Sequence, residues 1–173
     1  SMGKPVFFCA KPGEGNMKSD YFSIVGPVLN SGKECEKILR QLPEWFGDEQ
    51  TMIDYGIEID GLPTFMINMH HQVCGFISLK MHYKESAELY VLGILPEYHH
   101  QGLGRAAVES VTEYCRNQGI EYLQIKTLGP ATNWPSYEST RRFYLSLGFR
   151  PLEEFQTLWG PNCPCLQMIK KIL

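Results

Sequence analysis

A glycine-containing turn is the first feature of this sequence that could do chemistry. The apolar run Leu89–Leu95 is closed by Pro96, and a short polar stretch leads to Gly102-Leu103-Gly104. A helical pattern follows at once, so the glycines stand at a helix start, where backbone N–H groups lack partners and the helix dipole favours an anion. Glycine also leaves room for the anion and permits a tight turn. The pattern predicts a phosphate-binding turn, although an ordinary turn has the same sequence pattern.

The turn needs a strand before it and a helix after it, and the remaining sequence predicts more elements of both kinds. Strands are expected at Tyr21–Val25, Thr64–Met69, Val73–Met81, Leu89–Leu95, Tyr122–Thr127, Phe149–Phe155 and Cys165–Ile172. Helices are expected at Lys33–Leu42, Asp48–Asp60, from Leu103 to about Gln118, and at Tyr137–Leu147. Asp48 is the expected N-cap of the second helix. A hairpin turn is expected at His70-His71-Gln72.

The element order β-α-α-β-β-β-α-β-α-β-β predicts an α+β (mixed α/β) fold, with a central mixed sheet of seven strands flanked by about four helices. Hairpin-linked strands must be antiparallel, whereas the strand–helix–strand segment from Ala87 to Thr127 should give a parallel pair. Ligands bind where the strand order of such a sheet switches, and this place coincides with the glycine turn.

Composition limits the classes of partner. The 173 residues are 43% apolar and 20% charged, with a net charge of −3 and scattered basic residues, so no nucleic-acid or membrane partner is expected. No apolar run approaches the length of a membrane-spanning helix. Residues 1–19 are expected to form a flexible N-terminal arm, with Ser1-Met2 as a tag scar, and residues 20–173 to form a single domain.

The six cysteines, at positions 9, 35, 74, 115, 163 and 165, include no Cys-x-x-Cys pair and no histidine at zinc spacing. No metal site is therefore expected. Reduced thiols in a cytoplasmic protein are the favoured interpretation.

The glycine turn and a second motif resemble those of the GNAT-superfamily N-acetyltransferases. The family pattern Gln/Arg-x-x-Gly-x-Gly/Ala is read here as His99-His100-Gln101-Gly102-Leu103-Gly104. A helix ending in Phe-Tyr-x-x-x-Gly-Phe is matched by Phe143–Phe149. The resemblance extends over about Tyr21–Leu173, and Tyr137–Arg141 is similar to a bacterial branch of the family.

The resemblance implies acetyl-CoA as cosubstrate, CoA as product and no metal. It places the pyrophosphate on the turn and the pantetheine arm and reaction oxyanion on the backbone of the preceding strand. The implied cofactor-binding residues are Leu92, Gly93, Ile94, His99, His100, Gln101, Gly102, Leu103, Gly104, Arg105 and Tyr137. Two of them depart from the family pattern, because His99 replaces Gln or Arg and Tyr137 replaces an Asn.

The resemblance also implies two catalytic residues. Glu88, eleven residues before His99, matches the position of a general base, although a strand-end carboxylate beside Lys84 is an equally good interpretation. Tyr144 matches the family's general acid, which protonates the departing thiolate; the alternative is a core tyrosine bonded to a backbone carbonyl.

The expected function is therefore transfer of an acetyl group from acetyl-CoA to a primary amine, by direct attack in a ternary complex. The acceptor would be a small molecule or a peptide, and family members often form homodimers. The alternative is a sensor or regulatory module that binds acyl-CoA with little turnover.

Overall fold

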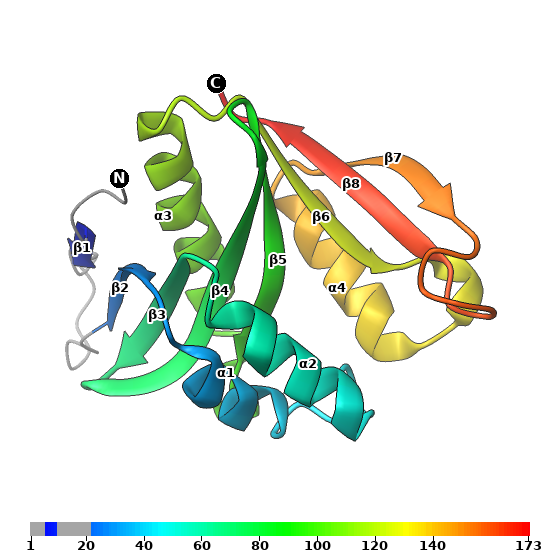
Figure 1. The fold of residues 1–173 in the computed structure, drawn as a ribbon, viewed down its shortest axis with the longest axis horizontal. Coiled ribbons are helices and arrows are strands. Elements are labelled where there is room, and N and C mark those ends of the chain that lie inside the picture. The colour runs from blue at the N-terminus through cyan, green and yellow to red at the C-terminus, as the bar shows by residue number, and fades with distance from the viewer. Residues whose placement is uncertain (1–5, 10–21) are drawn as a thin grey trace. The chain divides into compact units, whose positions relative to one another are not determined.

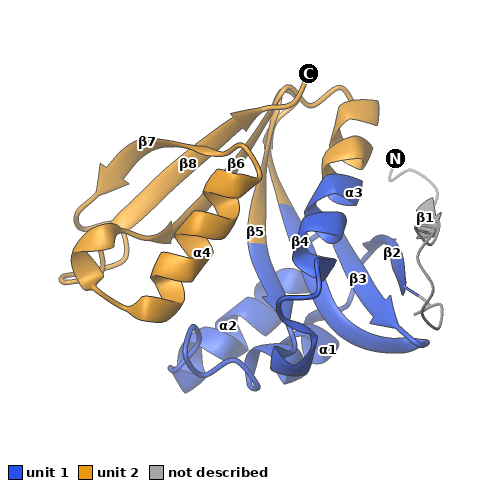
Figure 2. Ribbon diagram, turned by 180° about the vertical axis from the view of Figure 1, so that it is seen from behind, with its two compact units in different colours: residues 1–79, 91–111 blue, residues 80–90, 112–173 orange. Residues whose placement is uncertain are grey.

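The computed structural model describes residues 6–9 and 22–173, which fall into two compact units (Figures 1 and 2). Unit 1 comprises residues 1–79 and 91–111, and unit 2 comprises residues 80–90 and 112–173. The expected arm at residues 1–19, with its tag scar, lies outside the described residues apart from positions 6–9. The single domain expected at residues 20–173 stays a prediction.

Unit 1 contains an antiparallel sheet in the order β1-β2-β3-β4. Its strands are β1 (Val6–Cys9), β2 (Phe22–Val28), β3 (Thr64–Met69) and the first part of β4 (Gln72–Tyr83). The expected hairpin turn joins β3 to β4, with φ values of 49° at His70 and 64° at His71. Alternation along the strands buries Ile24, Phe65 and Ile67.

Two helices of unit 1, α1 (Gly32–Leu39) and α2 (Glu49–Ile59), approach each other closely. A Cβ at Gly32 would collide with the carbonyl oxygen of Gly56, so only glycine permits this spacing. The expected N-cap of α2 is confirmed, because Asp48 accepts a hydrogen bond of 2.9 Å from the backbone N–H of Thr51.

Unit 2 contains a mixed sheet in the order β5-β6-β8-β7. Its strands are the first part of β5 (Ser86–Ile94), β6 (Tyr122–Leu128), β7 (Arg150–Phe155) and β8 (Cys165–Lys171). The expected parallel pair is confirmed: β5 and β6 pair from Ser86↔Tyr122 to Glu88↔Gln124. β8 pairs antiparallel with both β6 and β7, and so lies between them.

The remaining helices follow these strands. After the short 3₁₀ turn η1 (Pro96–Tyr98), helix α3 (Leu103–Asn117) begins in unit 1 and ends in unit 2. After η2 (Pro130–Thr132), helix α4 (Pro135–Ser146) packs along β6, on the face of the unit 2 sheet seen in Figure 2.

The expected fold class is confirmed, and all seven expected strands and four expected helices are present. β1 is an additional strand. The expected end of the first helix at Leu42 was wrong, because α1 ends at Leu39 and the chain tightens into i→i−3 hydrogen bonds before Pro43. Among the described helices, none combines the length and the apolar character required to cross a membrane.

Candidate active site

The glycine turn of unit 1 adopts the left-handed backbone that its sequence predicts. The chain leaves β5, passes through η1, and has φ values of +58° at His100 and +79° at Gly102 before α3 begins at Leu103. A Cβ added to Gly102 would have nothing within 4 Å. Glycine is therefore favoured at this position by its positive φ value and not by a steric clash of a side chain with its neighbours. The space beside the turn is open.

The turn presents backbone amides along the axis of α3. The first amide of the helical ladder is that of Ala106, which donates to the carbonyl of Gly102 at 3.1 Å. The N–H groups of Leu103 and Gly104 precede it and have no carbonyl one turn behind them. Aligned amides at the start of a 15-residue helix make a site for an anion.

Two side chains fix the turn from within. The Nε2 atom of Gln101 donates to the carbonyl of Glu97 at 2.9 Å. The Nε2 atom of His99 lies 2.6 Å from the carbonyl oxygen of Ile94, and the His99 ring meets Trp45 edge-on at 5.8 Å between centroids. Because a carbonyl only accepts, Nε2 of His99 carries a proton and is engaged with the end of β5.

The end of β5 is built around Gly93. A Cβ there would lie 3.1 Å from the ring of Phe76 and 3.2 Å from Leu42, so a larger residue would displace the core of unit 1. The neighbouring residues Leu92 and Ile94 are half-buried. The contacts expected between these three residues and the pantetheine arm stay a prediction.

In unit 2, the carboxylate of Glu88 is buried between two nitrogen donors. One oxygen lies 2.7 Å from Nε2 of His82 on β4, and both oxygens lie 3.1 Å from Nζ of Lys126 on β6. Only 4% of the Glu88 side chain is exposed, against 30% for His82. Glu88 therefore does not face solvent at the end of its strand. Its partners are His82 and Lys126 rather than Lys84.

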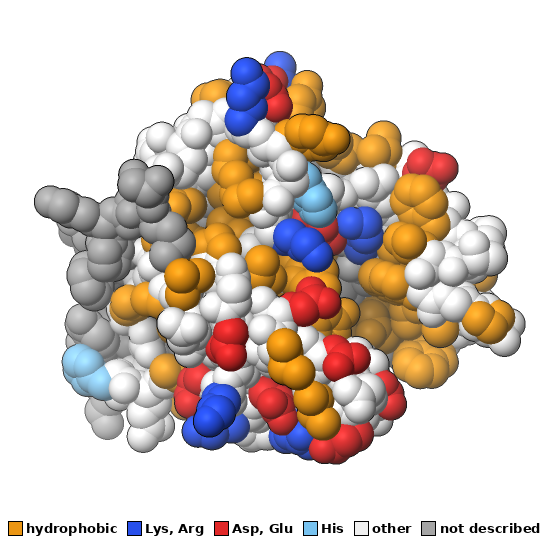
Figure 3. Space-filling model, in the orientation of Figure 1, with side chains coloured by type: hydrophobic (Ala, Val, Ile, Leu, Met, Phe, Trp, Pro, Cys, Tyr) orange, Lys and Arg blue, Asp and Glu red, His pale blue; other side chains and the backbone are white. Residues whose placement is uncertain are grey.

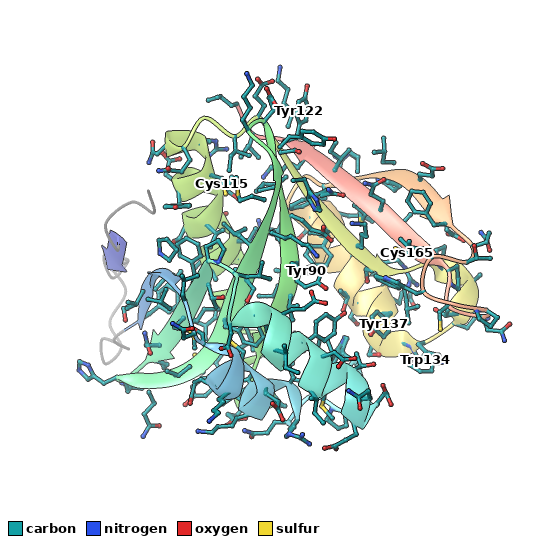
Figure 4. All side chains as sticks on the ribbon, viewed as in Figure 1. Tyr90, Cys115, Tyr122, Trp134, Tyr137 and Cys165 are labelled. Atoms are coloured by element: carbon teal, nitrogen blue, oxygen red, sulfur yellow. The ribbon has the colours of Figure 1, made fainter. Side chains whose placement is uncertain are left out.

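These residues belong to a polar face of the unit 2 sheet. Lys80 stands two residues before His82 and lies over the ring of Tyr90 at 4.5 Å from its centroid. Side chains two residues apart share a sheet face, so Tyr90 follows Glu88 on this side. Figure 3 shows histidine, basic and acidic side chains gathered over these strands, and Figure 4 labels Tyr90 among them.

Tyr144 is buried in α4 and packs between two aromatic rings. Its ring centroid lies 5.4 Å from that of Phe143 and 5.8 Å from that of Phe149. Burial, reinforced by the nearby Tyr137, raises the pKa of Tyr144 well above its usual value. The phenol is therefore protonated at every physiological pH and available as a donor.

Tyr137, which is expected to bind the cofactor, lies at the start of α4. Tyr137 lies next to Trp134, with centroids 6.1 Å apart, and Figure 4 shows both at this end of the helix. Arg141 donates to the carbonyl of Leu128 at 2.8 Å, and Arg142 pairs with Glu138. Both arginines thus have partners within their own unit.

Sequence reasoning missed His82 and Lys126, the two partners of Glu88. They come from different strands, and no motif joins them. Their only sequence signal is the alternation of the strand: Lys126 stands two positions after Gln124, the residue that pairs with Glu88, on the half-exposed face of β6.

Cys115, on α3, is buried and belongs to no metal site among the described residues. Within the described residues, no group of three or more metal-ligating side chains occurs. Burial raises the pKa of the Cys115 thiol to about 12, so this residue remains a thiol at neutral pH. Cys115 is therefore no candidate for the nucleophile of a covalent mechanism.

Comparison with known proteins agrees with the two motifs. A family model described as the acetyltransferase (GNAT) family matches residues 33–149. Comparison with curated proteins finds no match.

Three solved structures illustrate the shared fold. A GNAT-family protein from Desulfovibrio desulfuricans has a TM-score of 0.76 at 15% identity, over 88% of this chain and 99% of that one. The ribosomal-protein-S18-alanine N-acetyltransferase from Escherichia coli has a TM-score of 0.68 at 18% identity, over 87% and 94%. A GNAT-family acetyltransferase from Elizabethkingia anophelis, with acetyl-CoA bound, has a TM-score of 0.62 at 12% identity, over 96% and 97%.

Proposed function

The chain belongs to the acetyltransferase (GNAT) family, and from that premise we propose that it transfers the acetyl group of acetyl-CoA to a primary amine. The observation on which the proposal rests most directly is the left-handed turn at Gly102, which opens the N-terminus of α3 to an anion. Acetyl-CoA supplies that anion as its pyrophosphate.

The amides at the start of α3 would hold the pyrophosphate, together with the turn residues His100, Gln101 and Gly102 and the guanidinium of Arg105. The backbone of Leu92–Ile94 would hold the pantetheine arm and the oxyanion of the tetrahedral intermediate. His99 supports this arrangement by fixing the turn to Ile94, since its Nε2 atom is already engaged there. In unit 2, Tyr137 would contact the pantetheine arm.

The reaction requires proton removal from the acceptor. An alkyl ammonium group with a pKa near 10.4 is deprotonated in only about one molecule in a few thousand at pH 7. The proton would leave toward Glu88, directly or through a relay, and the neutral amine would attack the thioester without a covalent enzyme intermediate.

Tyr144 would serve the departing sulfur. Its raised pKa keeps the hydroxyl protonated until the thiolate forms, but it also makes full proton transfer to a thiolate unfavourable by itself. The transfer would therefore be coupled to loss of the second proton from the attacking nitrogen, which restores the phenol.

The acceptor class is proposed as a small-molecule or peptide amine. The Escherichia coli neighbour is named for an alanine of a ribosomal protein, which supports a peptide amine as one member of the class. Homodimer formation and a cytoplasmic location are likewise proposals.

Calorimetric titration with acetyl-CoA, followed by a thiol-release screen against amines of several classes, tests the function. Stoichiometric binding with thiol release for one class would support acetyl transfer. Binding without release for any amine would favour the acyl-CoA sensor. Absence of binding would contradict both.

A further inference from the structure

Glu88 and its two partners, His82 and Lys126, differ in how accessible they are to an incoming amine. Glu88 is 4% exposed, and its two oxygens accept hydrogen bonds from Lys126 and His82. An ammonium group arriving from solvent would have to displace these partners to reach the carboxylate. The imidazole of His82 is 30% exposed and lies at the outer end of the chain of contacts.

The hydrogen bond at 2.7 Å fixes which nitrogen of His82 carries the proton. The ammonium of Lys126 lies 3.1 Å from both oxygens of Glu88 and donates to them. An ionised carboxylate only accepts, so Nε2 of His82 donates. The lone pair of neutral imidazole is then on Nδ1, as in other carboxylate–histidine pairs that hold one tautomer.

We propose that His82 takes the proton from the acceptor amine through Nδ1, and that Glu88 is a positioning residue that holds the tautomer and stabilises the imidazolium. This inference rests on the proposed function and assigns the acceptance of the proton to His82 rather than to Glu88. Of the charged groups on this face of the sheet, Glu88 contacts His82 directly and Lys126 contacts Glu88. Lys80 stands two residues before His82 on β4.

The proposed reaction conserves atoms and charge. The ammonium gives one proton to Nδ1 of His82, and the freed lone pair on nitrogen forms the C–N bond at the thioester carbonyl carbon. Collapse of the intermediate breaks the C–S bond, and the thiolate takes the proton of Tyr144. The second proton of the nitrogen restores that phenol, and His82 releases its proton to solvent. The net result is one amide, one thiol and one proton.

The kinetic test compares His82→Gln with the wild type, using the amine that gives thiol release. His71→Gln, an exposed histidine in the β3–β4 turn, is the matched control. His82→Gln should lower kcat by about 10² to 10⁴ at neutral pH, the usual contribution of a general base, whereas the control should leave it unchanged. The ratio of wild-type kcat to variant kcat should shrink about tenfold per pH unit as the pH approaches the amine pKa near 10.4. Over this range the fraction of amine that is already neutral in solution rises, so the variant needs the missing base less.

Two further measurements separate proton transfer from a structural role. Added imidazole should restore turnover to His82→Gly in a concentration-dependent manner. Histidine ¹⁵N spectra of the wild type should show Nε2 protonated and Nδ1 unprotonated for His82, and Glu88→Gln should lose this preference.

The outcomes distinguish the inference from the function on which it rests. If no amine gives thiol release with the wild type, the proposed function fails and the inference fails with it. If the wild type is active and His82→Gln retains full kcat and an unaltered pH profile, only the inference is overturned. Loss of turnover in His82→Gly without imidazole rescue, together with the opposite tautomer, would assign His82 a structural role.

Discussion

The backbone N–H of Phe149 donates to the carbonyl of Tyr144 at 3.1 Å, and the two rings meet at 5.8 Å between centroids. A single turn at the end of α4 thus fixes both the main chain and the ring of the proposed acid. Gly148 makes the turn possible with φ of +92°. The motif that ends this helix therefore both terminates α4 and positions the ring of Tyr144.

Tyr144→Phe tests the acid directly. Removing the hydroxyl while keeping the ring should lower thiol release about a hundredfold, with acetyl-CoA affinity little changed, because the donor acts only as sulfur departs. Initial-rate kinetics measure the effect. Tyr122→Phe, at a tyrosine on β6 that has no proposed role, is the control; equal rates for both variants would remove Tyr144 from the chemistry.

Gly148→Ala tests the turn that positions Tyr144. A side chain at φ of +92° should lower the free energy of unfolding by about 1–2 kcal/mol. Urea denaturation measures the change. Gly61→Ala, where a Cβ would make an ordinary 3.6 Å contact, should cost less. An unchanged midpoint for Gly148→Ala would show that the turn is not under this constraint.

Gly102→Ala has an unusually close control at the other end of α3. Gly102 and Gly119 both have φ of +79°, and neither would have an atom within 4 Å of an added Cβ. Both substitutions should therefore destabilise the protein to a similar extent. Only Gly102→Ala should weaken acetyl-CoA binding, about tenfold or more, since only this turn is assigned to the pyrophosphate. Calorimetry measures both dissociation constants, and equal losses of affinity would contradict the assignment.

These glycines show how much of the site the sequence predicts. Gly102 and Gly148 are needed by the local backbone, so their positions relative to the neighbouring helices predict the turns correctly. The same local logic predicts the Asp48 cap and the parallel pairing of β5 with β6.

The partners of Glu88 could not be predicted in this way. His82 and Lys126 meet the carboxylate through strand pairing, and the pairing register is a property of the folded sheet rather than of any short segment. The hydrogen bond from His99 to the carbonyl of Ile94 could not be predicted from sequence either, because it depends on the backbone conformation of η1. Sequence patterns predicted the backbone of this site better than its side-chain contacts.

Buried thiols predict how stability changes at alkaline pH. Burial raises the pKa of Cys35 and of Cys115 from 9.0 to about 12. Each thiol is neutral in both states below pH 9, so its contribution to stability is fully present there. Above pH 9 the unfolded chain ionises first, and stability falls until the pH passes the folded value, by up to about 1.4 kcal/mol per pH unit for each thiol.

Urea denaturation of the wild type and Cys35→Ala between pH 7 and 10.5 checks this effect. The free energy of unfolding of Cys35→Ala should fall less between pH 9 and 10.5 than that of the wild type. This holds for any difference between the two proteins at pH 7. Parallel curves for the two proteins would show that Cys35 titrates alike in the folded and unfolded chains.

In the proposed reaction, the acetyl group moves from acetyl-CoA to an amine nitrogen. Incubation with acetyl-CoA deuterated in the acetyl group and the responsive amine, followed by mass spectrometry of the acceptor, tests it most directly. We predict one labelled acetyl group per acceptor, on the amine nitrogen, formed in proportion to released thiol. Label recovered only as free acetate, or only as intact acetyl-CoA, would contradict acetyl transfer to an amine.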